Sequence, residues 1–220
     1  MSSRSALRRA ENRIVEEDRF ALARLALEIS RRGLHDRRIL SVIEDLPRSL
    51  FCAAAHHDRA LLDRPVPIEC GQTIDRPSDL ALVYQAAEIA PEHRVLEIGT
   101  GSGYGTAILA RLAAKVYTVE RYRTLGELAL DRFAALELLN VVASIHDGFE
   151  GFARHAPFDR IVVDGAVEEV PAALLEQLAP KGVLVAAVGP TGAAQTLTRH
   201  RRTDRGIAVE RSEEHTSELQ

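Results

Sequence analysis

The residues that most clearly suggest chemistry in this chain form a glycine-rich turn, Val-Leu-Glu-Ile-Gly-Thr-Gly-Ser-Gly-Tyr-Gly, over residues 95–105. An apolar run stops at Glu97, and glycine then occupies every second position at Gly99, Gly101 and Gly103. This pattern is typical of a strand that enters a tight turn and opens a helix, where backbone N–H groups can approach a bound cofactor closely. We therefore expect the turn to hold a nucleotide.

The spacing of the glycines argues against two common nucleotide sites. A dinucleotide fingerprint needs glycine at the first, third and sixth positions, but the sixth position is Tyr104 when counted from Gly99 and Thr106 when counted from Gly101. A phosphate-binding P-loop needs Gly-Lys followed by Ser or Thr, and no lysine lies between Gly99 and Lys115. The turn therefore favours neither NAD nor a P-loop nucleotide.

Two acids further along the chain would complete a different site. An apolar segment from Lys115 to Val119 ends in Glu120, whose carboxylate can accept hydrogen bonds from both hydroxyls of a ribose. A third apolar segment is followed by Asp147-Gly148, where a short acid could accept a hydrogen bond from the exocyclic amine of an adenine. Asp-Gly is also a common turn, so its interpretation as a site depends on its register with the other two strand ends.

The sequence Glu-x-Gly-x-Gly-x-Gly, followed by a second strand that ends in an acid, resembles the cofactor site of class I S-adenosylmethionine (AdoMet) methyltransferases. The resemblance implies that AdoMet is the cofactor and that its methionine part lies against the glycines. The residues expected to bind it are Glu97, Gly99, Thr100, Gly101, Ser102, Gly103, Glu120, Arg121, Asp147, Gly148 and Asp164. No metal site is expected, because the two residues of the close histidine pair His56-His57 do not share a helix face.

Alternating helices and strands must position these groups. The periodicity predicts strands over 94–98, 115–119, 141–145, 159–164 and 183–188, and helices over 79–90, 104–113, 122–138 and 171–178. Such alternation indicates an α/β fold with a doubly wound, mostly parallel, Rossmann-like sheet, whose ligands bind at the carboxyl ends of the strands. Helices over 6–33 and 36–45 form an N-terminal helical extension, and residues 48–78 are expected to be irregular.

Composition agrees with a single α/β domain of this kind. A hydrophobic content of 46% over 220 residues is enough for a full core. The net charge of −4 gives no attraction for nucleic acid, and the absence of a signal peptide or an apolar span predicts a cytoplasmic chain without a membrane partner. Cys52 and Cys70 form no metal or redox pattern, so we expect inert, reduced thiols. We also expect a monomer.

A more specific resemblance lies in the segment Pro-Ile-Glu-Cys-Gly-Gln-Thr-Ile over residues 67–74, followed by Pro77, which is similar to the substrate loop of protein-L-isoaspartate O-methyltransferases. The glycine turn and the segments 46–48, 147–151, 156–161 and 170–178 match the same family in the same order, so the resemblance covers about residues 34–209. It implies methyl transfer from AdoMet to the α-carboxylate of L-isoaspartyl residues in damaged peptides or proteins, which is a repair reaction. The acceptor carboxylate is already ionised and the sulfonium already activated, so no general base is required.

Two acids depart from the family's pattern in the region that faces the acceptor. Asp75 follows Thr73 and Ile74, the other residues expected in the catalytic loop, at a position where the family typically has serine; Asp164 begins Asp-Gly-Ala where the family has a neutral run. An ionised acid would repel an anionic acceptor, so either one acid is protonated or turned outward, or the acceptor is not an anion. Asp75 could equally be a turn or capping acid.

These departures leave two alternatives beside the repair enzyme. The chain could be a related AdoMet methyltransferase that acts on another peptidyl or small-molecule nucleophile, or it could bind AdoMet without turnover.

Three regions are expected along the chain: residues 1–78 as helices and substrate loop packed on the core, 79–210 as the AdoMet-binding core, and 211–220 as a non-native tail. The tail, Arg-Ser-Glu-Glu-His-Thr-Ser-Glu-Leu-Gln, matches the translation of a common sequencing adapter and shares nothing with the family. On this interpretation Ile207–Glu210 is one strand of a final hairpin whose partner is missing, which predicts an exposed sheet edge and poor stability.

Overall fold

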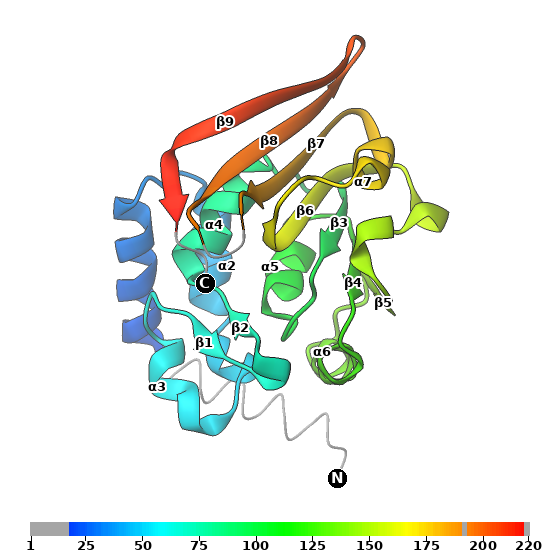
Figure 1. Ribbon diagram of the computed structural model, residues 1–220. Coiled ribbons are helices and arrows are strands. Elements are labelled where there is room, and N and C mark those ends of the chain that lie inside the picture. Colours follow the sequence, from blue (N-terminus) through cyan, green and yellow to red (C-terminus); the bar gives the residue numbers. More distant parts are fainter. Residues whose placement is uncertain (1–17, 191–192, 218–220) are drawn as a thin grey trace.

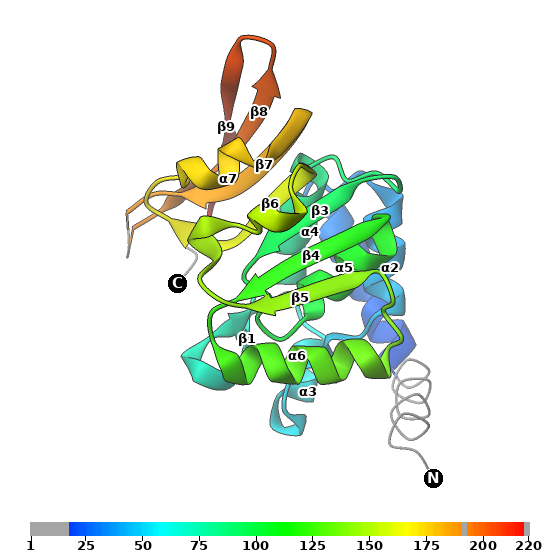
Figure 2. The same ribbon diagram turned by 90° about the vertical axis from the view of Figure 1, so that its right-hand side faces the viewer.

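A seven-stranded sheet forms the centre of the computed structural model, which describes residues 18–190 and 193–217 (Figures 1 and 2). The strand order is β5-β4-β3-β6-β7-β8-β9, parallel from β5 to β7 and antiparallel at β8 and β9. The strands are β3 (Arg94–Ile98), β4 (Lys115–Glu120), β5 (Val141–Ile145), β6 (Phe158–Val167), β7 (Leu178–Val188), β8 (Gln195–Thr203) and β9 (Gly206–Ser217). The predicted doubly wound, mostly parallel α/β fold is confirmed.

Two hydrophobic clusters cover the two faces of this sheet. Successive residues of β3 belong to opposite clusters, Val95 to one and Leu96 to the other, as the two-residue period of a strand requires. Helices α2 (Arg37–Asp45), α4 (Pro77–Ala86) and α5 (Tyr104–Leu112) pack in the first cluster, and α7 (Ala172–Glu176) packs in the second. Helix α6 (Arg123–Ala135) lies beside β4 and β5 (Figure 2). Each helix or strand predicted from residue 79 onward is therefore present; β3 and β5 have the predicted bounds, and the ends of the others are shifted.

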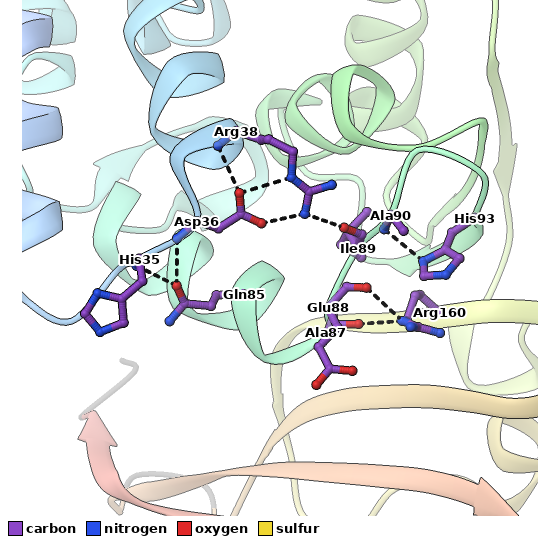
Figure 3. Close-up of polar contacts among 10 residues, drawn as sticks. All are labelled: His35, Asp36, Arg38, Gln85, Ala87, Glu88, Ile89, Ala90, His93 and Arg160. Carbon is purple, nitrogen blue, oxygen red and sulfur yellow. Dashed lines mark hydrogen bonds and ion pairs between the residues drawn. The ribbon is translucent and has the colours of Figure 1, made fainter.

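The N-terminal extension is fixed to the core by polar contacts as well as by packing. Residues 18–31 are helical, Gly33 follows with a φ of +96°, and residues 6–17 of the predicted helix lie outside the described part of the chain. Asp36 caps α2 by accepting a hydrogen bond from the Arg38 backbone N–H at 2.9 Å. The Gln85 side chain in α4 accepts from the backbone N–H groups of His35 and Asp36 at 2.7 and 3.1 Å (Figure 3). The extension and α4 are thus tied together.

The expectation that residues 48–78 are irregular is wrong in part. They contain the short helices η1 (Arg48–Phe51), η2 (Ala54–His56), α3 (His57–Ala60) and η3 (Glu69–Gly71), and the strands β1 (Val66–Pro67) and β2 (Thr73–Ile74). The strands pair antiparallel, Val66 with Ile74 and Pro67 with Thr73. The connecting turn uses positive φ angles at Cys70 and Gly71. Strands of two residues show no alternation, so their sequence carries no periodic signal.

The prediction that the strand at Ile207–Glu210 lacks its partner is also wrong. That strand belongs to β9, and β8 pairs with it antiparallel, for example Arg202 with Ile207 and Thr203 with Gly206. The sequence of β8 is rich in arginine and threonine, a composition that suggests a solvent-exposed segment and gives no sign of a strand. β9 does stand at the edge of the sheet, where Val209 is 53% exposed. The non-native origin of residues 211–220 stays a prediction.

Among the described residues, no helix is long and apolar enough to cross a bilayer.

Candidate functional site

A cleft of about 960 Å³ runs along the carboxyl ends of β3, β4, β5 and β6. It is lined by all of the predicted site residues except Glu97 and Gly103. Those that line it are Thr73, Ile74, Asp75, Gly99, Thr100, Gly101, Ser102, Glu120, Arg121, Asp147, Gly148 and Asp164. Gly103 is instead the N-cap of α5, and Glu97 is fully buried beneath the cleft. The predicted cofactor residues therefore share one cavity with the loop of Thr73, Ile74 and Asp75, which we call the acceptor loop.

The glycine turn is held against its neighbouring strands by the backbone. The Gly99 N–H donates to the Val119 carbonyl at 2.9 Å, at the end of β4. Gly99 has a φ of +98°, and a Cβ at this position would lie 2.8 Å from the Asp164 carbonyl oxygen. A side chain here would be both strained and in collision with β6. The turn consequently needs glycine at residue 99 in order to pass so close to Asp164.

Glu120 links the turn to the end of β4. Its side chain is 5% exposed, and its two oxygens accept hydrogen bonds from the backbone N–H groups of Gly101 and Tyr122, each at 2.8 Å. Each carboxylate oxygen keeps a second lone pair. The neighbouring Arg121 side chain stacks on the Tyr122 ring, with 4.8 Å between its central carbon and the ring centroid. Glu120 is therefore placed to accept hydrogen bonds from a diol in the cleft.

Asp147 begins the turn after β5. One of its carboxylate oxygens accepts a hydrogen bond from the Phe149 N–H at 3.0 Å and so caps the short helix η4 (Gly148–Glu150). Gln177, which follows α7, fixes the rest of this loop: it accepts from the Phe152 N–H and donates to the Glu150 carbonyl, both at 2.8 Å. Sequence reasoning missed Gln177, because its partners are some 25 residues away in the chain. The turn interpretation and the site interpretation of Asp147 are compatible.

The acceptor loop is anchored by a buried arginine. Arg48 is 1% exposed, and its five N–H groups donate to five backbone carbonyls, those of Arg59, Ala60, Leu62, Arg64 and Asp75, at 2.6 to 3.3 Å. Burial lowers the pKa of Arg48, although a guanidinium remains charged in proteins. The bond to the Asp75 carbonyl, at 2.8 Å, fixes the end of the loop that lines the cleft.

Several acids meet in or beneath the cleft. Burial raises the pKa of Asp75 to about 6, and the charge of Asp79 adds to that rise. Burial, with the charge of Glu97 as the next cause, raises the pKa of Asp164 well above its usual range. Glu97 accepts hydrogen bonds from the hydroxyls of Thr106 and Thr118, yet its burial raises its pKa to about 7. Burial thus favours the neutral form of these three acids.

These features suit a nucleoside cofactor that bears a diol and an amine. Glu120 and Asp147 lie at the ends of adjacent strands and offer acceptors for hydroxyl and amine donors. Gly101 and the neighbouring turn residues bring backbone to the cleft surface, and Ile98 and Leu125 give it apolar walls. In the described residues, no group of histidine, cysteine or acidic side chains has the arrangement of a metal site.

Comparison with known proteins gives matches over most of the chain. A family model described as protein-L-isoaspartate(D-aspartate) O-methyltransferase (PCMT) matches residues 23–217. A protein-L-isoaspartate O-methyltransferase of Rhodopseudomonas palustris (strain BisB18) is 48% identical over 181 residues, which are 82% of this chain and 84% of that protein. The matched range of the family model extends beyond residues 34–209 at both ends.

Solved structures have the same fold. A protein-L-isoaspartate O-methyltransferase superposes with a TM-score of 0.79 at 25% identity, covering 87% of this chain and 63% of that one. A beta-aspartate methyltransferase (PCMT) from Plasmodium falciparum, in complex with S-adenosyl-L-homocysteine, superposes with a TM-score of 0.74 at 23% identity, covering 86% of this chain and 93% of that one. Because the family model spans most of the chain and the bacterial relative is so similar, this chain belongs to the protein-L-isoaspartate (D-aspartate) O-methyltransferase family.

Proposed function

We propose that this protein transfers a methyl group from AdoMet to the α-carboxylate of L-isoaspartyl residues in damaged peptides or proteins. The observation that carries the proposal is the continuity of the cleft, which joins Glu120 and Asp147 at one end of the sheet to the loop of Thr73–Asp75. Membership of the family supports the same reaction. Donor and acceptor would therefore meet within one cavity.

The cofactor end of the cleft is assigned from its hydrogen-bonding groups. Glu120 would accept the two ribose hydroxyls through its spare lone pairs, and Asp147 would accept the adenine amine. Gly99, Gly101 and their neighbours would lie against the methionine part. The complex of the Plasmodium falciparum relative with S-adenosyl-L-homocysteine supports this choice of cofactor. Bound AdoMet supplies an electrophilic methyl group whose leaving group is a neutral thioether.

The acceptor end of the cleft has to position a carboxylate and exclude water. Thr73 is exposed and lines the cleft, and a threonine hydroxyl can donate a hydrogen bond to an anion. Ile74 is 5% exposed and fixes the strand to the core. An isoaspartyl carboxylate is ionised at neutral pH, so these residues need not remove a proton from it. Alignment of the nucleophile with the methyl group is what the protein contributes.

The test is methyl transfer from labelled AdoMet to an isoaspartyl peptide, with the same peptide containing ordinary aspartate as the control. We expect the label only on the isoaspartyl peptide. Equal labelling of both peptides, or transfer only to a different nucleophile, would refute the proposed acceptor. Calorimetric binding of S-adenosyl-L-homocysteine without transfer to any peptide would show a binding protein instead.

We also infer a cytoplasmic location without nucleic acid partners. The two cysteines, Cys52 and Cys70, are free thiols, which is typical of a reducing compartment. The net charge of −4 supports the absence of a nucleic acid partner. The expected monomer stays a prediction, which sedimentation equilibrium would check.

A further inference from the structure

Three side-chain oxygens converge on Gly105, in the first turn of α5. A Cβ at this position would lie 2.5 Å from the Tyr84 hydroxyl, 2.9 Å from Glu97 Oε1 and 3.1 Å from Asp164 Oδ2. The three residues come from α4, β3 and β6. Tyr84 and Glu97 are each 0% exposed, whereas Asp164 lines the cleft. The missing side chain at Gly105 thus leaves room for a polar cluster in which Asp164 is the acid that lines the cleft.

The hydrogen bonding of this cluster is incomplete if both acids are ionised. Glu97 Oε2 accepts from Thr106 and Thr118, but Glu97 Oε1 and the Tyr84 hydroxyl have no partner among the described residues. Glu97 Oε1 and Asp164 Oδ2 lie beside the same point at Gly105, so these two carboxyl oxygens are at most about 6 Å apart. Two carboxylates cannot bond each other without a proton, because both are acceptors only. A single proton between them supplies the donor that Glu97 Oε1 lacks.

The surroundings of the two carboxyl groups favour keeping that proton. Glu97 is fully buried and Asp164 is half-buried, and the ionisable groups that face them are Asp75, Glu120 and Tyr84. The two carboxylates among these groups disfavour a second negative charge on the pair. The Tyr84 phenol remains neutral, since burial raises its pKa well above the usual range.

We propose that Glu97 and Asp164 hold one proton between them, and that this acid pair makes the cleft tolerant of an anionic acceptor. With the proton, the pair carries one negative charge and Asp164 presents a neutral carboxyl group to the cleft. Without it, Asp164 places a second charge at the wall that Asp75 also lines, which would repel a carboxylate. Asp164 is then a specificity-determining residue that acts through its protonation state.

The protonation itself can be tested on the protein alone. Infrared spectra should contain a protonated carboxyl C=O band at about pH 7 that shifts in D₂O, because ordinary acids are ionised there. Asp164→Asn should remove this band, and Asp131→Asn, at an exposed acid of α6, should leave it unchanged. A wild-type spectrum without the band, or a band that survives in both Asp164→Asn and Asp164→Thr, would overturn the proposal.

The consequence for the acceptor rests on the proposed function and needs a second measurement. The KM for the isoaspartyl peptide should rise about tenfold per pH unit once the pair loses its proton, while the affinity for S-adenosyl-L-homocysteine changes little. In Asp164→Asn, which keeps the shape and a donor but has no proton to lose, this rise should be much smaller. An identical KM profile in wild type and Asp164→Asn would refute the role in specificity.

The two proposals can fail separately. If no variant methylates the peptide at any pH, the proposed function is wrong, and the infrared band still decides whether the pair holds a proton. If the peptide is methylated but the band is absent, the acid pair is wrong and the proposed function stands.

Discussion

Arg48→Lys is the substitution whose cost can be worked out most directly from the structure. Arg48 gives each of its five N–H groups to a buried or half-buried backbone carbonyl. A lysine keeps the charge but has three donors on one atom, so at least two carbonyls lose their partner. At about 1–3 kcal/mol for each unsatisfied buried group, the free energy of unfolding should fall by about 2–6 kcal/mol. That is a large part of the roughly 5–15 kcal/mol typical of a domain.

Urea unfolding followed by circular dichroism measures this loss. The matched control is Arg59→Lys, because the Arg59 side chain is exposed and only its backbone carbonyl takes part in the network. The control should remain within about 0.5 kcal/mol of wild type. A loss below about 1 kcal/mol in Arg48→Lys would refute the reasoning, since it would mean that lysine or water replaces the missing donors.

The same variant gives a second readout in the enzyme, provided that it folds. Arg48 donates to the Asp75 carbonyl, so a shift of the acceptor loop should raise the KM for the peptide more than it weakens the affinity for S-adenosyl-L-homocysteine. Equal losses in both would instead indicate a general loosening of the protein.

Two further variants test individual acids of the cleft. Glu120→Gln should weaken the affinity for S-adenosyl-L-homocysteine, measured by calorimetry, by about 10- to 100-fold, because hydrogen bonds to a charged acceptor contribute about 1.5–3 kcal/mol. Asp131→Asn is the control, and an unchanged affinity in Glu120→Gln would contradict the ribose assignment. Asp75→Asn should be more stable than wild type above about pH 6 and equally stable below about pH 4. The reason is that the pKa of Asp75 is raised to about 6 in the folded state, so the wild-type protein loses stability as the pH rises from about 4 to about 6. The difference in the free energy of unfolding has an upper limit of about 3 kcal/mol, which partial exposure reduces to about 1 kcal/mol. Urea unfolding at the two pH values measures it, and an equal change in stability for both proteins would contradict the prediction.

The sequence was sufficient to predict the parallel core because those strands are apolar on both faces. β3 and β5 begin and end at the predicted residues, and β4 is one residue longer. β8 escaped prediction because its outward-facing arginines and threonines hide the period of a strand whose neighbours are β7 and β9. The pairing of β1 with β2 is too short to leave a pattern. Local periodicity therefore revealed buried strands and missed the exposed or very short ones.

The site was predictable where its residues follow strands, and it was not where they meet across the chain. Glu120 and Asp147 were found because parallel strands end at the same edge of a sheet. In the sequence, nothing distinguishes Tyr84 from the apolar residues of a helix. Likewise, nothing distinguishes Arg48 from any basic residue that follows a proline. Their importance comes from burial and from neighbours that are distant in the sequence: Arg48 donates to the Asp75 carbonyl, and the Tyr84 hydroxyl lies beside Gly105 together with Asp164.

The two departures from the family's pattern, Asp75 and Asp164, have different protonation behaviour. Asp75 is partly exposed and would ionise near pH 6, whereas Asp164 lies near the fully buried Glu97 and should retain a proton to higher pH. Repulsion of an anionic acceptor should therefore increase in two steps as the pH rises. Removing Asp75 should abolish the lower step and leave the upper one, and removing Asp164 should do the reverse. The double variant should bind the acceptor with no such pH dependence, because neither acid then titrates in this range.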